Sequence, residues 1–220
     1  IFIGNSFTYY GKCVLEKTQS KLTQAERIHD QGYFYQICKA NGIDVSVTNW
    51  CFGSHSITDT FAEACTCAST PCKGVNHPSY LTDRNFDYVA IQCFTEKQYE
   101  SDLASYLKPV TDIFRQENPN VKFLLLGPHM AYDKSYKWVQ DVEAMADAGF
   151  IVCNWGGMVH DIVQKTVEVP GAKQPYGRPT FVVSVSEKDG HHENLLAGYI
   201  TALMTYCAIT GESAVGQSYA

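Results

Sequence analysis

The 220-residue sequence has no long hydrophobic run, no block of positive charge and no low-complexity tract. No apolar segment reaches the roughly 18 to 20 residues of a membrane-spanning helix, so no such helix is expected. The 17 lysines and arginines, against 23 acidic residues, form no cationic stripe, which argues against nucleic acid as a partner. Without repeats or linkers, and with 45% hydrophobic residues, residues 1–220 are predicted to form one domain.

The start of the chain also lacks the charged and apolar regions of a signal peptide. Ile1 already lies in the first predicted strand, so we expect that upstream residues have been removed or left out. A signal peptide could be among them, which leaves the location open. Nine cysteines are many for a cytosolic enzyme and favour a secreted or extracytoplasmic location. Three of them lie in the stretch ACTCASTPCKG, which could contain disulfides or free thiols. A zinc site is the third interpretation, although the spacing is not a standard zinc signature. Its ligands would be Cys65, Cys67, Cys72 and His77.

Strands and helices alternate along the sequence. Short apolar or alternating runs predict strands at 1–3, 43–50, 86–93, 121–128 and 150–153. Helical spacing of apolar residues predicts helices at 26–40, 103–114, 138–148, 158–167 and 194–209. Pro109 should kink or bound the second of these helices. Strands separated by helices pair in parallel through right-handed crossovers. We therefore expect an α/β fold, a three-layer α/β/α sandwich around a central, mainly parallel five-stranded sheet.

The first predicted strand ends abruptly in Gly4-Asn5-Ser6. In open parallel sheets the ligand crevice lies outside the carboxyl ends of the strands, and Ser6 would stand at such an end. A serine there can be an ordinary turn or helix-cap residue, or it can be a nucleophile. The second interpretation requires a base that takes the hydroxyl proton.

A candidate base lies near the other end of the chain, in the segment EKDGHHENLLAGY. An imidazole takes a serine proton well when a carboxylate holds its other nitrogen in the right tautomer. Asp189 supplies the carboxylate, and His192 or, as a fallback, His191 supplies the imidazole. In the alternative interpretation, Asp189 caps the following helix and the two histidines are solvated.

Together, these two segments resemble the SGNH (GDSL-type) hydrolases. Gly4-Asn5-Ser6-Phe7-Thr8 is similar to the first sequence block of that family, and Asp189-x-x-His192 is similar to its last block, which carries the Asp and His of a Ser-His-Asp triad. Gly53, in WCFGSHS, resembles the glycine whose amide helps to form the oxyanion hole. The resemblance implies the flavodoxin-like fold of the family and a serine esterase without metal or organic cofactor. The GNSFT-bearing branch, to which the first block is most similar, is regarded as acting on carbohydrate.

The sequence departs from the family pattern at the third block. Family members commonly have Gly-x-Asn-Asp there, whereas this chain has IQCFTEKQY. Glu96 stands near the Asn position, but its carboxylate would repel an oxyanion. Gln92 carries an amide donor and is our candidate for the third oxyanion donor; alternatively, it is a polar strand-end residue bonded to a neighbouring loop. Further candidates for substrate contact are Asn5, His55, Glu96 and His129.

The expected reaction is hydrolysis of a short acyl ester, an acetyl ester on carbohydrate. Ser6 attacks the carbonyl, His192 takes its proton and Asp189 stabilises the imidazolium. The amides of Ser6 and Gly53, with the Gln92 side chain, receive the oxyanion. A lipid-ester or thioester hydrolase with the same triad and a non-catalytic binding domain remain open as alternatives. Aromatic residues near strand ends could stack on sugars or pack in the core: Tyr9, Tyr10, Trp50, Phe52, Phe94 and Trp155.

Overall fold

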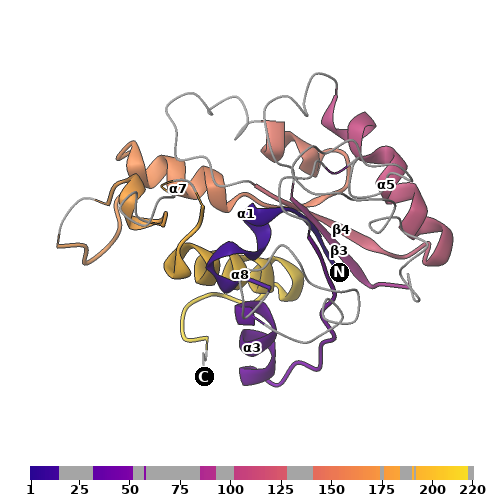
Figure 1. The fold of residues 1–220 in the computed structure, drawn as a ribbon, viewed down its shortest axis with the longest axis horizontal. Coiled ribbons are helices and arrows are strands. Elements are labelled where there is room, and N and C mark those ends of the chain that lie inside the picture. Colours follow the sequence, from indigo (N-terminus) through magenta and orange to yellow (C-terminus); the bar gives the residue numbers. More distant parts are fainter. Residues whose placement is uncertain are drawn as a thin grey trace.

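A parallel sheet forms the centre of the molecule. The computed structural model describes residues 1–14, 32–51, 57, 85–92, 102–127, 141–173, 176–183, 190 and 192–217. Within these residues, five strands pair in parallel in the order β2-β1-β3-β4-β5. The strands are β1 Phe2–Gly4, β2 Asn49–Cys51, β3 Tyr88–Gln92, β4 Lys122–Leu126 and β5 Ile151–Cys153. The predicted α/β fold with a five-stranded parallel sheet is confirmed (Figure 1).

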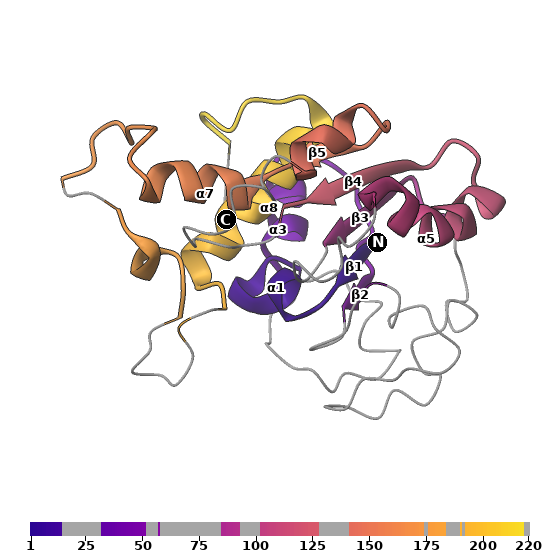
Figure 2. The ribbon, with the colours of Figure 1, turned by 90° about the horizontal axis from the view of Figure 1, so that it is seen from above.

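Described helices lie on both faces of the sheet. The helices are α1 Ser6–Tyr9, α3 Gly32–Ala40, α5 Leu103–Glu117, α7 Trp155–Val163 and α8 Leu195–Thr210. Shorter 3-10 turns are η1 Tyr10–Lys12, η4 Ala144–Ala146 and η5 Arg178–Thr180. Figure 2 shows α5 on one side of the sheet, with α3 and α8 on the other. None of the helices in the described ranges is long and apolar enough to cross a bilayer.

Alternate residues of the central strands bury their side chains in different apolar clusters. In β3, Val89 and Ile91 pack in the cluster that contains the apolar stripe of α5, whereas Ala90 packs in the cluster formed with α3 and α8. In β4, Leu125 belongs to the first cluster and Leu124 to the second. Strands of this kind are nearly continuous apolar runs because both of their faces are covered.

The second predicted strand is much shorter than its sequence pattern suggested. Residues 43–50 alternate in polarity, but β2 comprises only Asn49–Cys51. Among the described residues, β2 pairs with β1 in a register that starts at Phe2 and Asn49, and the amide of Phe2 also donates to the carbonyl of Thr48 at 2.8 Å. The remaining residues of the predicted strand have no regular secondary structure.

Several helix boundaries also differ from the prediction. α7 begins at Trp155, not Met158, because the side chain of Asn154 accepts a hydrogen bond from the amide of Gly157 at 3.1 Å and caps the helix. α5 continues through Pro109, which therefore does not end it. Of the predicted helix at 138–148, residues 141–143 are helical and continue into η4. Of the predicted helix at 26–40, α3 forms the described part, and the remainder lies outside the described residues.

The predicted terminal helix agrees closely with α8. The side chain of Asn194 accepts a hydrogen bond from the amide of Ala197 at 3.0 Å, which caps the start of the helix. Gly211 follows the last residue with φ 75, the left-handed conformation that commonly ends helices at glycine.

Candidate active site

The centre of the sheet contains a topological switch point. β1 and β3 are neighbours, but the chain leads from β1 to β2 on one side and from β3 to β4 on the other. Such a point opens a crevice outside the carboxyl ends of the two strands. Asn5 and Ser6 directly follow β1, and Gln92 is the last residue of β3. Three of the predicted site residues therefore lie at the edge where a crevice is expected.

The capping role considered for Ser6 belongs to its neighbour Asn5. The Asn5 side chain accepts a hydrogen bond from the amide of Phe7 at 3.0 Å and thereby caps α1. Asn5 is fully buried, so it has a structural role in the site, and contact with substrate stays a prediction. Ser6 is the first residue of α1, with 7% of its surface exposed. The hydroxyl of Ser6 is therefore not the helix cap.

Ser6 and His192 lie together although they are 186 residues apart in the sequence. The distance from Nε2 of His192 to Oγ of Ser6 is 2.9 Å, which is within hydrogen-bond range. His191, the fallback base, and Asp189, the expected triad acid, lie outside the described residues. The structure thus brings together the predicted nucleophile and the predicted base.

Two kinds of contact hold His192 at this position. Its ring stacks on Tyr10, with centroids 3.9 Å apart and planes 13° from parallel, and lies 5.2 Å from the ring of Phe7. Its backbone carbonyl accepts a hydrogen bond from the amide of Val183 at 2.8 Å. Neither Tyr10 nor Phe7 was predicted to contact His192. Tyr10 was considered only as a sugar-stacking or packing residue.

The segment after His192 is tied to the 180–183 stretch. The amide of Asn194 donates to the carbonyl of Phe181 at 3.1 Å, and the Asn194 side chain donates to the carbonyl of Thr180 at 2.8 Å. Because Asn194 also caps α8, the alternative in which Asp189 caps that helix is wrong. Asn194 therefore links the start of α8 to the backbone beside the base.

Gln92 is held by the helix that carries Ser6. The hydroxyl of Thr8 donates to Oε1 of Gln92 at 3.1 Å, and Gln92 is only 1% exposed. A Cβ on Gly4 would overlap the Thr8 hydroxyl, so the last residue of β1 must be small. Thr8 was not among the predicted site residues, although it lies on the helix that starts at the end of β1, beside β3. Donation by Gln92 to an oxyanion stays a prediction.

Glu193, the residue after the candidate base, has a buried side chain. It is 0% exposed, and neither carboxyl oxygen has a hydrogen-bond partner among the described residues. Burial raises the pKa of this carboxyl well above its usual range, which favours the neutral acid. Burial also raises the pKa of the Cys13 thiol, and Glu193 adds to that increase. Glu193 was not among the predicted site residues.

Several predicted residues cannot be placed relative to this pair because they lie outside the described residues: Gly53, His55, Glu96, His129 and the cysteine cluster with His77. Their roles stay predictions. Within the described ranges, no group of three or more His, Cys, Asp or Glu side chains could hold a metal ion.

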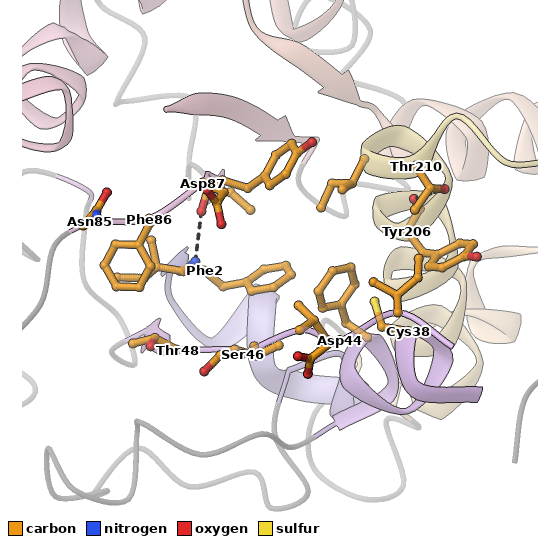
Figure 3. A pocket seen from close by; sticks show the side chains of 18 residues that line it. Phe2, Cys38, Asp44, Ser46, Thr48, Asn85, Phe86, Asp87, Tyr206 and Thr210 are labelled. Atoms are coloured by element: carbon orange, nitrogen blue, oxygen red, sulfur yellow. Dashed lines mark hydrogen bonds between the residues drawn. The ribbon is translucent and has the colours of Figure 1, made fainter. Parts of the chain in front are cut away.

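A cavity of about 420 Å³ lies at the other end of the sheet, near the amino ends of β1 and β3. Figure 3 shows that its wall includes aromatic side chains such as Phe2 and Tyr206, with the carboxylates of Asp44 and Asp87 also present. Because β1 and β3 are parallel, this cavity is separated from the Ser6 and His192 pair by the length of the strands. It is not the crevice at the switch point.

Comparison of the chain with protein-family models, with curated proteins and with solved structures gives no match. The resemblance to the SGNH hydrolases therefore depends on the short sequence motifs alone.

Proposed function

We propose that this chain is a serine hydrolase of the SGNH type that cleaves short acyl esters. The main support for this proposal is the 2.9 Å distance between Nε2 of His192 and Oγ of Ser6. At this separation an imidazole can accept the hydroxyl proton while the oxygen attacks a carbonyl carbon. The position of the pair at the carboxyl ends of parallel strands, where substrates commonly bind, supports it further.

The reaction has two steps in this proposal. Oγ of Ser6 bonds to the ester carbon as His192 takes its proton, and the proton passes to the leaving alcohol when the ester C–O bond breaks. Water then attacks the acyl-enzyme, His192 takes a proton from that water, and the proton returns to Ser6 as the carboxylic acid leaves. Asp189 is proposed to orient His192 and to stabilise the imidazolium.

The oxyanion of each tetrahedral intermediate requires hydrogen-bond donors. We assign the backbone amides of Ser6 and Gly53 to this role by resemblance, and the Gln92 side chain by its position. Gln92 ends β3 and is bonded to Thr8, which lies on the same short helix as Ser6. Removal of one such donor typically lowers the rate about 10²-fold to 10³-fold.

Acetylated carbohydrate is the proposed substrate class, and only the motif resemblance supports that choice. One observation favours the second candidate, a lipid-ester or thioester hydrolase. Leu195 and Leu196, shortly after His192, are 54% and 45% exposed and place apolar surface at the start of α8. Rates on p-nitrophenyl esters of increasing acyl length separate the candidates: a maximum at acetate supports the first, and a maximum at octanoate or longer supports the second.

Ser6→Ala tests the proposed function directly. We expect turnover of p-nitrophenyl acetate to fall by about 10³ or more, with the thermal midpoint nearly unchanged. A fluorophosphonate should label the unaltered protein at Ser6 and should not label the variant. Ser213→Ala, which removes an exposed hydroxyl near the end of the chain, is the control and should keep full activity. Full turnover by a folded Ser6→Ala protein would refute the proposal.

A further inference from the structure

Three aromatic rings form a stack that ends on the candidate base. Tyr9 lies 5.6 Å from Tyr10, with the planes 29° apart, and Tyr10 lies 3.9 Å from His192, with the planes 13° apart. Tyr10 therefore covers one face of the imidazole at van der Waals distance. The Nε2 atom in the plane of that imidazole is the atom that lies 2.9 Å from Ser6 Oγ.

The backbone fixes Tyr10 in this position. After Tyr10 the chain turns at Gly11, which has φ 71 and lies directly against α8. A Cβ on Gly11 would lie 2.9 Å from the Cα of Gly198 and would overlap the carbonyl of Asn194. Because α8 begins just after His192, this contact joins the segment that carries Tyr10 to the segment that carries the base.

We propose that Tyr10 is a positioning residue for His192, which holds the imidazole plane toward Ser6 and stabilises the imidazolium form. The π face of a phenol ring attracts a cation, so stacking favours protonated over neutral imidazole. The ring contact also restricts rotation of the imidazole, which keeps Nε2 close to the hydroxyl. The catalytic consequence depends on the proposed function, whereas the effect on imidazole titration does not.

Other titratable groups near His192 must be separated from this effect. On the segment that carries Tyr10 they are Tyr9, Lys12 and Cys13, and on the segment that carries the base Glu193; residues 180–183 and the first turn of α8 carry none. Asp189 and His191, which precede His192 in the sequence, lie outside the described residues. A change at Tyr10 alters none of these groups. The titration of His192 therefore reports on the stack itself.

The experiment compares Tyr10→Leu, Tyr10→Phe and the unaltered protein by NMR titration of the imidazole protons. The His192 signal is identified by its loss in His192→Gln. We expect Tyr10→Leu to lower the pKa of His192 by about half a unit, or roughly threefold in the protonation equilibrium, and Tyr10→Phe to restore it. The acid limb of kcat should move to lower pH in Tyr10→Leu, and kcat should fall while KM stays nearly constant.

Two further variants test the effect of the Tyr10 ring on His192. Tyr33→Leu removes a ring whose centroid lies 5.8 Å from that of Tyr199 in α8, and it should leave the His192 titration unchanged. A tetrafluorophenylalanine at position 10 keeps the shape of the ring but weakens its π face, so it should lower the pKa of His192 even if Tyr10→Leu does not fold. An unchanged titration with that residue in place would overturn the proposal. Retained hydrolysis by Ser6→Ala would refute the proposed function instead, while the titration still tests the stack.

Discussion

The buried carboxyl of Glu193 leads to a prediction in which substitution stabilises the protein. Glu193 is 0% exposed, both of its oxygens lack a partner among the described residues, and burial raises its pKa well above the usual range. In the unfolded chain the same carboxyl titrates near its ordinary value of about 4.3. Above that pH, the folded state keeps a proton that the unfolded state has lost.

This difference in bound protons determines the sign and the size of the effect. Since the folded state binds one proton more, the free energy of unfolding decreases by about 1.4 kcal/mol per pH unit between the ordinary and the raised pKa. Glu193→Gln has nearly the same shape and cannot ionise, so it does not show this loss. The variant should match the unaltered protein near pH 4 and become more stable than it as the pH rises, by about 1.4 kcal/mol per pH unit up to the raised pKa.

Urea unfolding at a series of pH values from 4 to 7 measures the difference. The slope of free energy against urea should be the same for both proteins, because the surface exposed on unfolding does not change. Glu168→Gln is a matched control at an exposed position and should change the free energy of unfolding by no more than about 0.5 kcal/mol throughout. A constant difference between Glu193→Gln and the unaltered protein would show that the carboxyl is solvated or paired in the folded state.

Three further predictions concern the site. His192→Ala should abolish ester hydrolysis, and His191→Ala should retain much of it. The activity of the unaltered protein should rise with pH through the titration of a histidine. If the two variants rank in the reverse order, the base is His191. Gln92→Ala should lower kcat by roughly 10² with little change in KM, whereas Glu96→Gln should leave kcat nearly unchanged; a silent Gln92→Ala would exclude it as an oxyanion donor. Gly198→Ala should lower the thermal midpoint, because the new Cβ would overlap the backbone of η1. In most helices the same change stabilises by about 1 kcal/mol. An unchanged midpoint would show that η1 can shift.

The sequence patterns were reliable where both faces of a strand are covered. FDYVAIQC and VKFLLLGP are nearly continuous apolar runs, and their central parts form β3 and β4 in the middle of the sheet. Residues 43–50 show an equally clear alternation, but β2, at the edge of the described sheet, comprises only Asn49–Cys51. Alternation indicates how a strand could be buried, but it does not supply the neighbour with which the strand pairs.

The same distinction applies to the candidate site. The positions of Ser6 and His192 could be predicted because each follows from its place in the chain, one after a strand and the other before a helix. The stack of Tyr10 on His192 could not be predicted, because it depends on how closely η1 approaches α8. The burial of Glu193 was missed for a related reason: a carboxylate in a polar segment suggests solvent exposure, and the backbone bridge of Glu193 to Val182 is not visible in the sequence pattern.

The geometry of the site also depends on a backbone contact that neither motif contains. Ser6 lies on a helix of four residues, too short to be rigid by itself, and His192 precedes α8 in a turn that is bonded to residues 181–183. Gly11 and Gly198 join these two segments at a separation that permits no side chain on either residue. Movement at this contact would change the distance between Oγ and Nε2 while the sheet and its apolar clusters stayed intact. Activity should consequently be lost at a lower denaturant concentration than the one at which the sheet unfolds. The packing of η1 on α8 sets the order of these two transitions, loss of activity and unfolding of the sheet.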